Sequence, residues 1–488
     1  VSRRHLLLSA AATAPLAGCD RALSWLSDSF GGGIPSSFEP PSAAVVDPIE
    51  HLLSRTSFGP RPGDRERVAR MGRDAYIAEQ LEPAAIDDRA CAMRSDAIDV
   101  VHLDEGLFEL PSDEIETQLG RHAVLRATYS RRQLEEVMVE LWHDHFHVAI
   151  GKSLCQKLLP AYDRDVIRKH ALGSFRELLG ATAKSAAMLV YLDGRENKRV
   201  ESSDRPNENY ARELFELHTL GIHGGYSQAD IMEAARCLTG FVVKEEWAPG
   251  QVELALERHD DGEKRLLGET IGAGGGAQDM ERLLDIVAAH PSTATHVSRK
   301  IVATFIDDEP PDAAVEHVAS TFRATRGDLR AVVKSALGWD GFDAHAGTKI
   351  KRPFRYLVSA LRALSADTHA KGDLVAWLAR MGHSPFAWPT PDGYPASGEA
   401  WLATLMLRFR FAFALTGGTI EGTSVDIDRL SAAVGGEEPL MRLVAHLLGR
   451  TPRPDERHLF ASSVDLASTH SGPRALALAL ASPAFQRF

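Results

Sequence analysis

The chain has 488 residues, of which 44% are hydrophobic and 25% are charged. This composition is typical of a folded globular protein and excludes a wholly disordered or collagen-like chain. The 55 lysines and arginines are outnumbered by 67 aspartates and glutamates, which gives a formal net charge of -12. An acidic chain repels phosphate backbones, so no nucleic-acid partner is expected. No apolar run reaches the roughly 18 residues that a transmembrane helix requires.

The first 18 residues have the layout of an export signal. Arg3 and Arg4 form a charged start, and the short apolar run that follows them ends near Leu16. This arrangement is typical of secretory signals, and the paired arginines resemble the twin-arginine export signal. We therefore expect residues 1–18 to direct export by the twin-arginine route to the periplasm or cell envelope.

Residues 16–19, Leu-Ala-Gly-Cys, resemble a bacterial lipobox, in which Cys19 would be lipidated and become the mature N-terminus. Lipid chains on Cys19 would attach the protein to a membrane. The alternative is a plain signal peptide with an incidental cysteine. The segment 19–46 is rich in Gly, Pro and Ser, which predicts a flexible, lipid-anchored linker. The other three cysteines are widely spaced, which favours buried free thiols over disulfides.

Helical periodicity dominates the chain from about residue 47 onward. In residues 131–146 apolar side chains recur at helical spacing, and Ser227 begins a capping box ahead of another helix. Residues 241–270 break this pattern with short β-prone runs and a turn, which predicts a small β-hairpin. The sequence therefore predicts a mainly α fold with one large multi-helical domain over 47–488. The hairpin excursion is the one place where that domain could divide.

The most polar segment is residues 206–221, which has a proline near its start and a glycine at its end and so predicts one helix. Glu208, Arg212 and Glu216 step by four and share one face, while Glu213 lies on a neighbouring row. Two carboxylates beside an arginine can provide a protonated acid and an ionised base, as acid–base hydrolysis requires. The alternative is a structural ladder of ion pairs.

His145 is a further catalytic candidate. It falls on the apolar stripe of the helix predicted over 131–146, and a buried histidine needs a hydrogen-bond partner such as a carboxylate from another helix. A core histidine with a purely structural partner would give the same pattern. His143 and His147 have the i, i+4 spacing of a metal-binding pair, but they lack the glutamate of the HExxH protease motif. No metal ligand is therefore predicted.

Three residues are predicted to bind substrate. Trp388 and Tyr394 lie in a long proline-rich loop over residues 384–395 and could present aromatic faces to a sugar or a peptide. Aromatic residues beside prolines can equally pin such a loop to the core. Asn207, at the start of the polar helix, completes the set. With Asp193 and neighbouring oxygen-bearing residues, Asn207 could alternatively surround a hard cation or form ordinary Asx turns.

Together these segments resemble a bacterial family known as domain of unknown function 1800. The resemblance rests first on Pro206-Asn207-Glu208-Asn209-Tyr210-Ala211-Arg212-Glu213. Supporting motifs follow the family's order between about residues 51 and 410, and they are Arg55 with Phe58-Gly59, Trp142-His143-Asp144-His145-Phe146, Gly225-Tyr226-Ser227, Thr239-Gly240, His290-Pro291, Lys351-Arg352-Pro353 and Pro391-Asp392-Gly393-Tyr394. The one departure is Asp144, where the family would have asparagine.

The resemblance implies an exported, largely helical bacterial protein. Members of the family are often encoded beside a sulfatase-like protein with a twin-arginine signal, which implies such a protein as a partner. The resemblance brings no activity, no cofactor and no catalytic residue with it.

The leading hypothesis from the sequence is an envelope-anchored hydrolase of a polymeric or sugar-like substrate. Glu208 or Glu213 would supply the acid–base chemistry, Arg212 would orient the pair, and His145 would support them from a facing helix. The alternatives are a non-catalytic scaffold or export partner of another secreted protein, and a metal-dependent protein. The sequence identifies no cofactor.

Overall fold

The computed structural model describes residues 16–199, 201, 204–246, 248–462 and 471–488. Its α-helices are α2 (Leu16–Ser27), α3 (Pro48–Thr56), α4 (Asp64–Met71), α5 (Arg73–Gln80), α6 (Arg89–Ser95), α7 (Ser112–Tyr129), α8 (Gln133–His145), α9 (Cys155–Ala161), α10 (Phe175–Ala183), α11 (Ala186–Tyr191), α12 (Asn209–Glu213), α13 (Gln228–Cys237), α14 (Ala277–Ala289), α15 (Pro291–Phe305), α16 (Asp312–Thr325), α17 (Leu329–Leu337), α18 (Pro353–Ala363), α19 (Gly372–Arg380), α20 (Leu405–Thr416), α21 (Ile427–Val434), α22 (Pro439–Leu448), α23 (Pro454–Ser462), α24 (Ser471–Ala481) and α25 (Pro483–Gln486). Four shorter helical segments also matter below, and they are η1 (Asp28–Gly32), η5 (Tyr162–Arg168), η7 (Leu214–His218) and η10 (Gly398–Thr404).

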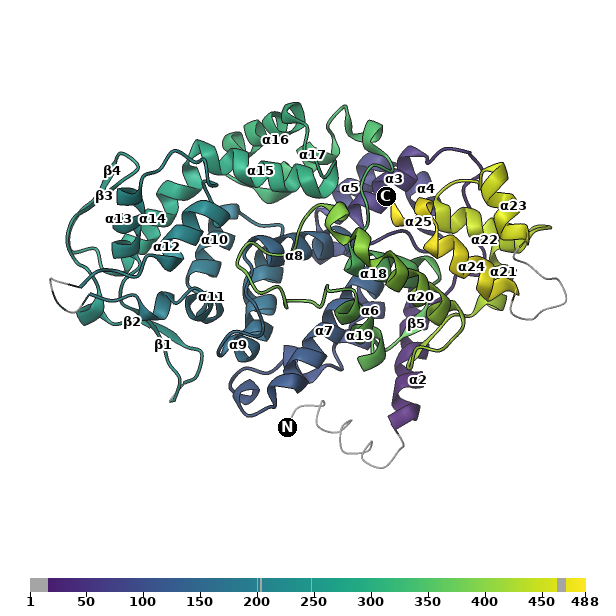
Figure 1. Ribbon diagram of the computed structural model, residues 1–488, viewed down its shortest axis with the longest axis horizontal. Coiled ribbons are helices and arrows are strands. Elements are labelled where there is room, and N and C mark those ends of the chain that lie inside the picture. Colours follow the sequence, from purple (N-terminus) through teal and green to yellow (C-terminus); the bar gives the residue numbers. More distant parts are fainter. Residues whose placement is uncertain (1–15, 200, 202–203, 247, 463–470) are drawn as a thin grey trace.

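The molecule is elongated, with helices at both ends of a central group. Figure 1 shows α12, α13 and α14 at one end and α21 to α24 at the other, with α7, α8 and α18 between them. Helices α15 to α17 lie along one long edge. The predicted mainly α fold is confirmed. Within the described ranges, each helix is too short or too polar to traverse a lipid bilayer.

Among the described residues, three small antiparallel sheets interrupt the helices. β1 (Phe241–Val243) pairs with β2 (Val252–Leu254), and β3 (Lys264–Leu266) pairs with β4 (Glu269–Ile271). The β excursion predicted near 241–270 is therefore confirmed, as two hairpins. The third sheet joins β5 (Asp367–Thr368) to β6 (Thr423–Ser424). Strands of two residues leave no alternating pattern, so the sequence did not indicate this pair.

Short-range signals explain where several helices begin. The Asp47 carboxylate accepts two backbone hydrogen bonds at the start of α3, and Ser227 forms the predicted capping box of α13. The helix predicted over 206–221 is corrected at its start, because α12 begins only at Asn209. The residues before it are held in a turn, and the π-helical η7 continues α12 to His218.

The N-terminal segment is packed against the body, which corrects the flexible linker expected over 19–46. Helix α2 is followed by residues 28–39, here called the strap. Ile34 and Phe38 of the strap are buried in the core, and the backbone N–H of Phe38 donates to Ala433. These two apolar side chains find a hydrophobic surface that composition alone does not reveal, so the segment is ordered despite its glycines and prolines.

The predicted export signal lies largely outside the described residues. Arg3 and Arg4 lie outside the described residues, and of Cys19 only the helical backbone is described. The other cysteines, Cys91, Cys155 and Cys237, are buried free thiols, as predicted.

Helix α18 forms the centre of the core, and all eleven of its residues are buried. Two of them are arginines that donate hydrogen bonds to carbonyls near the ends of other helices. Arg362 donates to the carbonyls of Gly59 and Thr128 at 2.6 and 2.8 Å, and Arg355 donates to Ser54 at 2.9 Å. Carbonyls near helix ends lack a partner within the helix, so these guanidiniums supply one.

A buried ion-pair network joins α7, α8 and η5. Glu136 of α8 lies between Arg126 and Arg168, at 2.7 and 2.8 Å. Asp163 in turn accepts from Arg168 and from Nε2 of His143, each at 2.7 Å. Although burial alone would raise it, the Arg168 charge and the His143 hydrogen bond hold the pKa of Asp163 well below its usual range. The network therefore fixes α8 in position.

Replacing Asp163 with asparagine should lower the free energy of unfolding by about 3–5 kcal/mol at pH 7, because Arg168 loses a buried counter-charge. The depressed pKa of Asp163 stabilises the folded state above the ordinary carboxyl pKa, and this contribution is lost as the pH falls below about 4. Urea unfolding should therefore show that the difference between wild type and D163N shrinks in acid.

The matched control is Asp165, two residues further along η5, whose side chain is 55% exposed and pairs with Arg164. D165N should change stability by no more than about 0.5 kcal/mol. Equal effects of the two substitutions would show that the Asp163 network does not hold α8.

Candidate functional site

Three of the predicted polar residues form an ion-pair ladder on the surface of α12 and η7. Arg212 contacts the carboxylates of Glu208 at 3.0 Å and Glu216 at 3.4 Å, and it also donates to Gln228 at 3.0 Å. All three charged side chains are about one third exposed. Glu208 is thus neutralised and bonded on two sides. Glu208 and Arg212 therefore form the structural ladder of ion pairs that was the alternative to a catalytic role.

Glu213 stands apart from this ladder. Among the described residues, its carboxylate has neither an ion pair nor a hydrogen bond, and the side chain is half-buried. Partial burial raises the pKa of Glu213, and so does the negative charge of Glu216. Arg212 lowers this pKa, and Asp392 adds the smallest of the four effects, in the raising direction. This environment favours a protonated carboxyl group that can give up its proton to a bound molecule.

The second carboxylate of this region comes from the loop over residues 384–395. Asp392 is exposed, and its Oδ1 accepts from the Thr390 hydroxyl at 2.5 Å and from the Trp388 indole at 3.4 Å. The hydroxyl of Tyr191, at the end of α11, donates to Pro389 of the same loop at 3.2 Å. Tyr191 lies close enough to both Asp392 and Glu213 for their charges to add to the effect of burial in raising its pKa.

The loop is fixed against the C-terminal end of α8. The ring Nε2 of His147 lies 2.7 Å from the Trp388 carbonyl, and Gly393 has a φ of +73°. A Cβ atom on Gly393 would lie 2.2 Å from the carbonyl oxygen of Asp144, so only glycine allows this approach. The geometry holds Trp388 half-buried beside Asp392. Tyr394, in contrast, is buried and donates to the Ser384 carbonyl at 2.5 Å, so it anchors the loop.

His145 does not meet the glutamates of α12. It is buried, and its Nε2 lies 3.0 Å from the carbonyl oxygen of His218. The rings of Trp142, Phe146 and Phe175 surround it, and burial lowers its pKa well below the usual value. The helical period correctly places His145 on the buried face of α8, but its partner is a main-chain carbonyl. Its predicted supporting role at the glutamates is therefore corrected.

Asn207 has a local structural role. Its backbone N–H donates to Asn197 at 2.9 Å, and its own Oδ1 accepts from the N–H of Asn209 at 2.9 Å. This is an Asx turn at the start of α12, as the sequence offered for Asn207 as an alternative, and its contact with substrate stays a prediction. Within the described ranges, no three His, Cys, Asp or Glu side chains are arranged to hold a metal ion.

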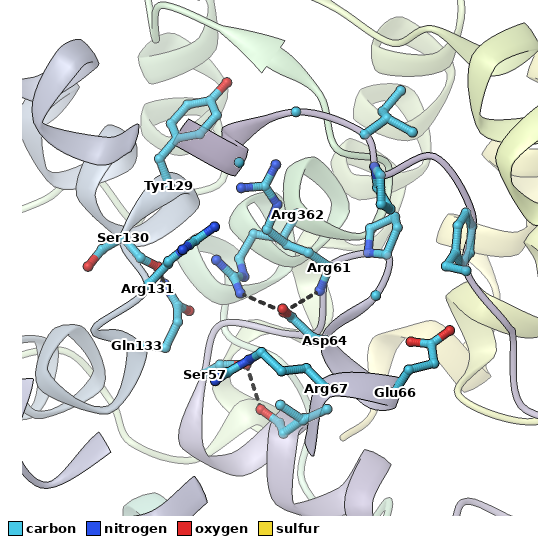
Figure 2. Close-up of a pocket in the computed structure, with 18 of the residues that line it drawn as sticks. Ser57, Arg61, Asp64, Glu66, Arg67, Tyr129, Ser130, Arg131, Gln133 and Arg362 are labelled. Carbon is cyan, nitrogen blue, oxygen red and sulfur yellow. Dashed lines mark hydrogen bonds and ion pairs between the residues drawn. The ribbon is translucent and has the colours of Figure 1, made fainter. Parts of the chain in front are cut away.

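Two features that could take part in chemistry are not predicted by the sequence. The pairing of His143 with Asp163 joins residues 20 positions apart, and nothing in their spacing signals it. The second feature is a cavity of about 900 Å³ beneath the strap (Figure 2). Its arginines are scattered from Arg61 to Arg429, so only the tertiary structure gathers them.

The comparisons with known proteins identify a family without an assigned activity. A family model described as protein of unknown function (DUF1800) matches residues 51–487. No curated protein and no solved structure gives a match. Because the family model covers nearly the whole described chain, this protein belongs to the DUF1800 family.

Proposed function

We propose that this protein is an exported, envelope-anchored acid–base hydrolase that acts on a polymeric or sugar-like substrate. The observation that carries the proposal is the pair formed by Glu213 and Asp392. One carboxyl group is half-buried, raised in pKa and, within the described ranges, free of ion pairs, and the other is exposed and bonded to Thr390 and Trp388. Two carboxyl groups in such different environments can divide the roles of acid and base between them.

In this mechanism Glu213 donates its proton to the leaving-group oxygen. Asp392 then acts from the loop, either by activating a water molecule or by attacking the substrate directly. The half-buried Trp388 ring lies beside Asp392 and supplies an aromatic face for a sugar ring. Arg212 acts through its ion pairs, which hold the helix that carries Glu213.

Replacing Glu213 with glutamine should reduce hydrolysis about 10²- to 10⁴-fold, because the general acid is lost. Wild-type activity should also fall as the pH rises through the raised pKa of Glu213, since only the protonated form can donate. The assay uses chromogenic aryl glycosides and isolated cell-wall polysaccharide, with thermal melting to check folding. The matched control is E316Q, which should retain activity, because Glu316 is 68% exposed on α16 and pairs with Arg323. A folded E213Q variant with full activity would contradict the proposal.

A second candidate function, a scaffold or export partner, rests on a different surface. Leu402, Leu405, Met406 and Phe409 recur at helical spacing along η10 and α20, and they are 41–65% exposed. The opposite face of α20 packs against α24. An apolar stripe of this kind is typical of a protein-binding face, and the family resemblance supplies an exported sulfatase-like protein as its occupant.

Introducing glutamate at Met406 and Phe409 together should abolish co-purification with a co-expressed sulfatase-like protein encoded beside this chain, because charges would enter the apolar contact. The control is L256E, because Leu256 is 68% exposed on a separate part of the surface. Co-purification that survives the double substitution would exclude this stripe as the binding face.

Export and lipid attachment are supported by the arginine pair and by the lipobox-like residues 16–19. Replacing Cys19 with alanine should move the protein from the detergent phase to the aqueous phase in Triton X-114 partitioning, because the acyl chains are lost. C91A, which alters a buried thiol, is the control and should leave partitioning unchanged. A wild-type protein found only in the aqueous phase would contradict the anchor.

A further inference from the structure

Several parts of the chain line the cavity beneath the strap. They include the α3–α4 connection with Arg61, the α7–α8 connection with Arg131, the central helix α18 with Arg362, helix α21 with Arg429, and the strap itself. Figure 2 shows Arg61, Arg131 and Arg362 gathered within it, with the Asp64 carboxylate between Arg61 and Arg362. The cavity shares no lining residue with the Glu213 and Asp392 region.

Three guanidiniums of this cavity each hold a carbonyl of the strap. Arg61 donates to Gly32, Arg131 donates to Phe30 at 3.3 Å, and Arg429 donates to Ile34 at 3.1 Å. In the part of the chain that the structure describes, none of these three guanidiniums has a carboxylate within ion-pair distance. A guanidinium carries five N–H donors. Each of these three uses one of them on the strap, and all three side chains line the cavity.

The carboxylates that line the cavity are mostly occupied by other arginines. Five of them form ion pairs, and these pairs are Asp64 with Arg362 at 3.4 Å, Asp28 with Arg94 at 3.7 Å, Glu79 with Arg67 at 2.8 Å, Glu39 with Arg442 at 2.6 Å, and Asp87 with Arg89 at 2.6 Å. The sixth, Glu66, accepts from the backbone N–H of Glu39. Five carboxylates are therefore neutralised by other arginines, Glu66 keeps its charge, and Arg61, Arg131 and Arg429 keep theirs.

The inner guanidiniums are poorly solvated. Burial lowers the pKa of Arg61 and lowers that of Arg362 to about 10, despite the opposing effect of Asp64 on both. Asp64 forms an ion pair with Arg362, whereas from Arg61 it accepts only the backbone N–H. A bound anion would supply the missing counter-charge, and guanidiniums match planar or tetrahedral oxyanions in geometry as well as in charge.

We propose that this cavity binds a small molecule bearing an oxyanion group, namely a phosphate, sulfate or carboxylate, through Arg61, Arg131 and Arg429. The volume of about 900 Å³ accommodates a ligand the size of a sugar or larger. The strap forms one wall, so the ligand and the strap carbonyls share the same three arginines. Gly31 makes this arrangement possible, because a Cβ atom there would lie 2.3 Å from Nη2 of Arg131.

The experiment is a calorimetric titration of the full chain with inorganic phosphate, sulfate, glucose 6-phosphate and glucuronate, each against sodium chloride at matched ionic strength. At least one oxyanion should bind at a single saturable site, and the sugar-linked probes should distinguish a phosphate from a carboxylate ligand. R61Q and R131Q should each weaken that binding at least tenfold. The matched control is R265Q, because Arg265 is 77% exposed on the β3–β4 hairpin and pairs with Glu263.

A second measurement uses the wild-type protein, so it tests the proposal even if the variants fail to fold. Hydrogen exchange of the wild-type strap, residues 28–39, should slow when the bound probe reaches saturation. The proposal is overturned if none of the probes binds more tightly than chloride. It is also overturned if R61Q and R131Q bind as wild type does, or if exchange in the strap is unchanged at saturation.

Discussion

The architecture depends on buried arginines that donate to main-chain carbonyls. Arg55, Arg355, Arg362 and Arg408 are all buried, and each reaches a carbonyl on a distant segment. Burial lowers the pKa of all four, to about 9 for Arg55 and about 10 for the others. A desolvated cation is costly, but so is an unpaired buried carbonyl, and each group relieves the other. Many short helices are thereby joined at their ends.

The strap extends the same principle to the surface of the core. Arg61, Arg131 and Arg429 bind its carbonyls as the inner arginines bind helix ends, but their remaining donors face an open cavity. An arginine of this kind is therefore structural where protein surrounds its guanidinium, and it is available to a ligand where the guanidinium borders a cavity. Together with the buried side chains of Ile34 and Phe38, these hydrogen bonds order a segment rich in glycine and proline and connect it to the cavity below.

The family motif around α12 combines structure and chemistry within a few residues. Asn207 forms the turn that starts the helix, and Glu208 and Arg212 belong to its ion-pair ladder. The spacing of these residues predicted such structural roles as alternatives to catalysis, because residues four apart share a helix face. Glu213 differs from Glu208 and Arg212 in its surroundings, because the loop that carries Asp392 lies opposite it. The sequence could not show that Asp392, 179 positions later, approaches that face, since the loop is positioned by His147 and Gly393.

The sequence by itself determined the helical class, the span of α8, the capping box of α13, the β excursion and the family, because periodicity and capping are local properties. The tertiary structure decided which polar groups meet. His145 faces a carbonyl instead of a carboxylate, His143 meets Asp163, and distant arginines converge beneath the strap. Such contacts depend on how helices pack, and packing joins residues whose separation along the chain carries no signal.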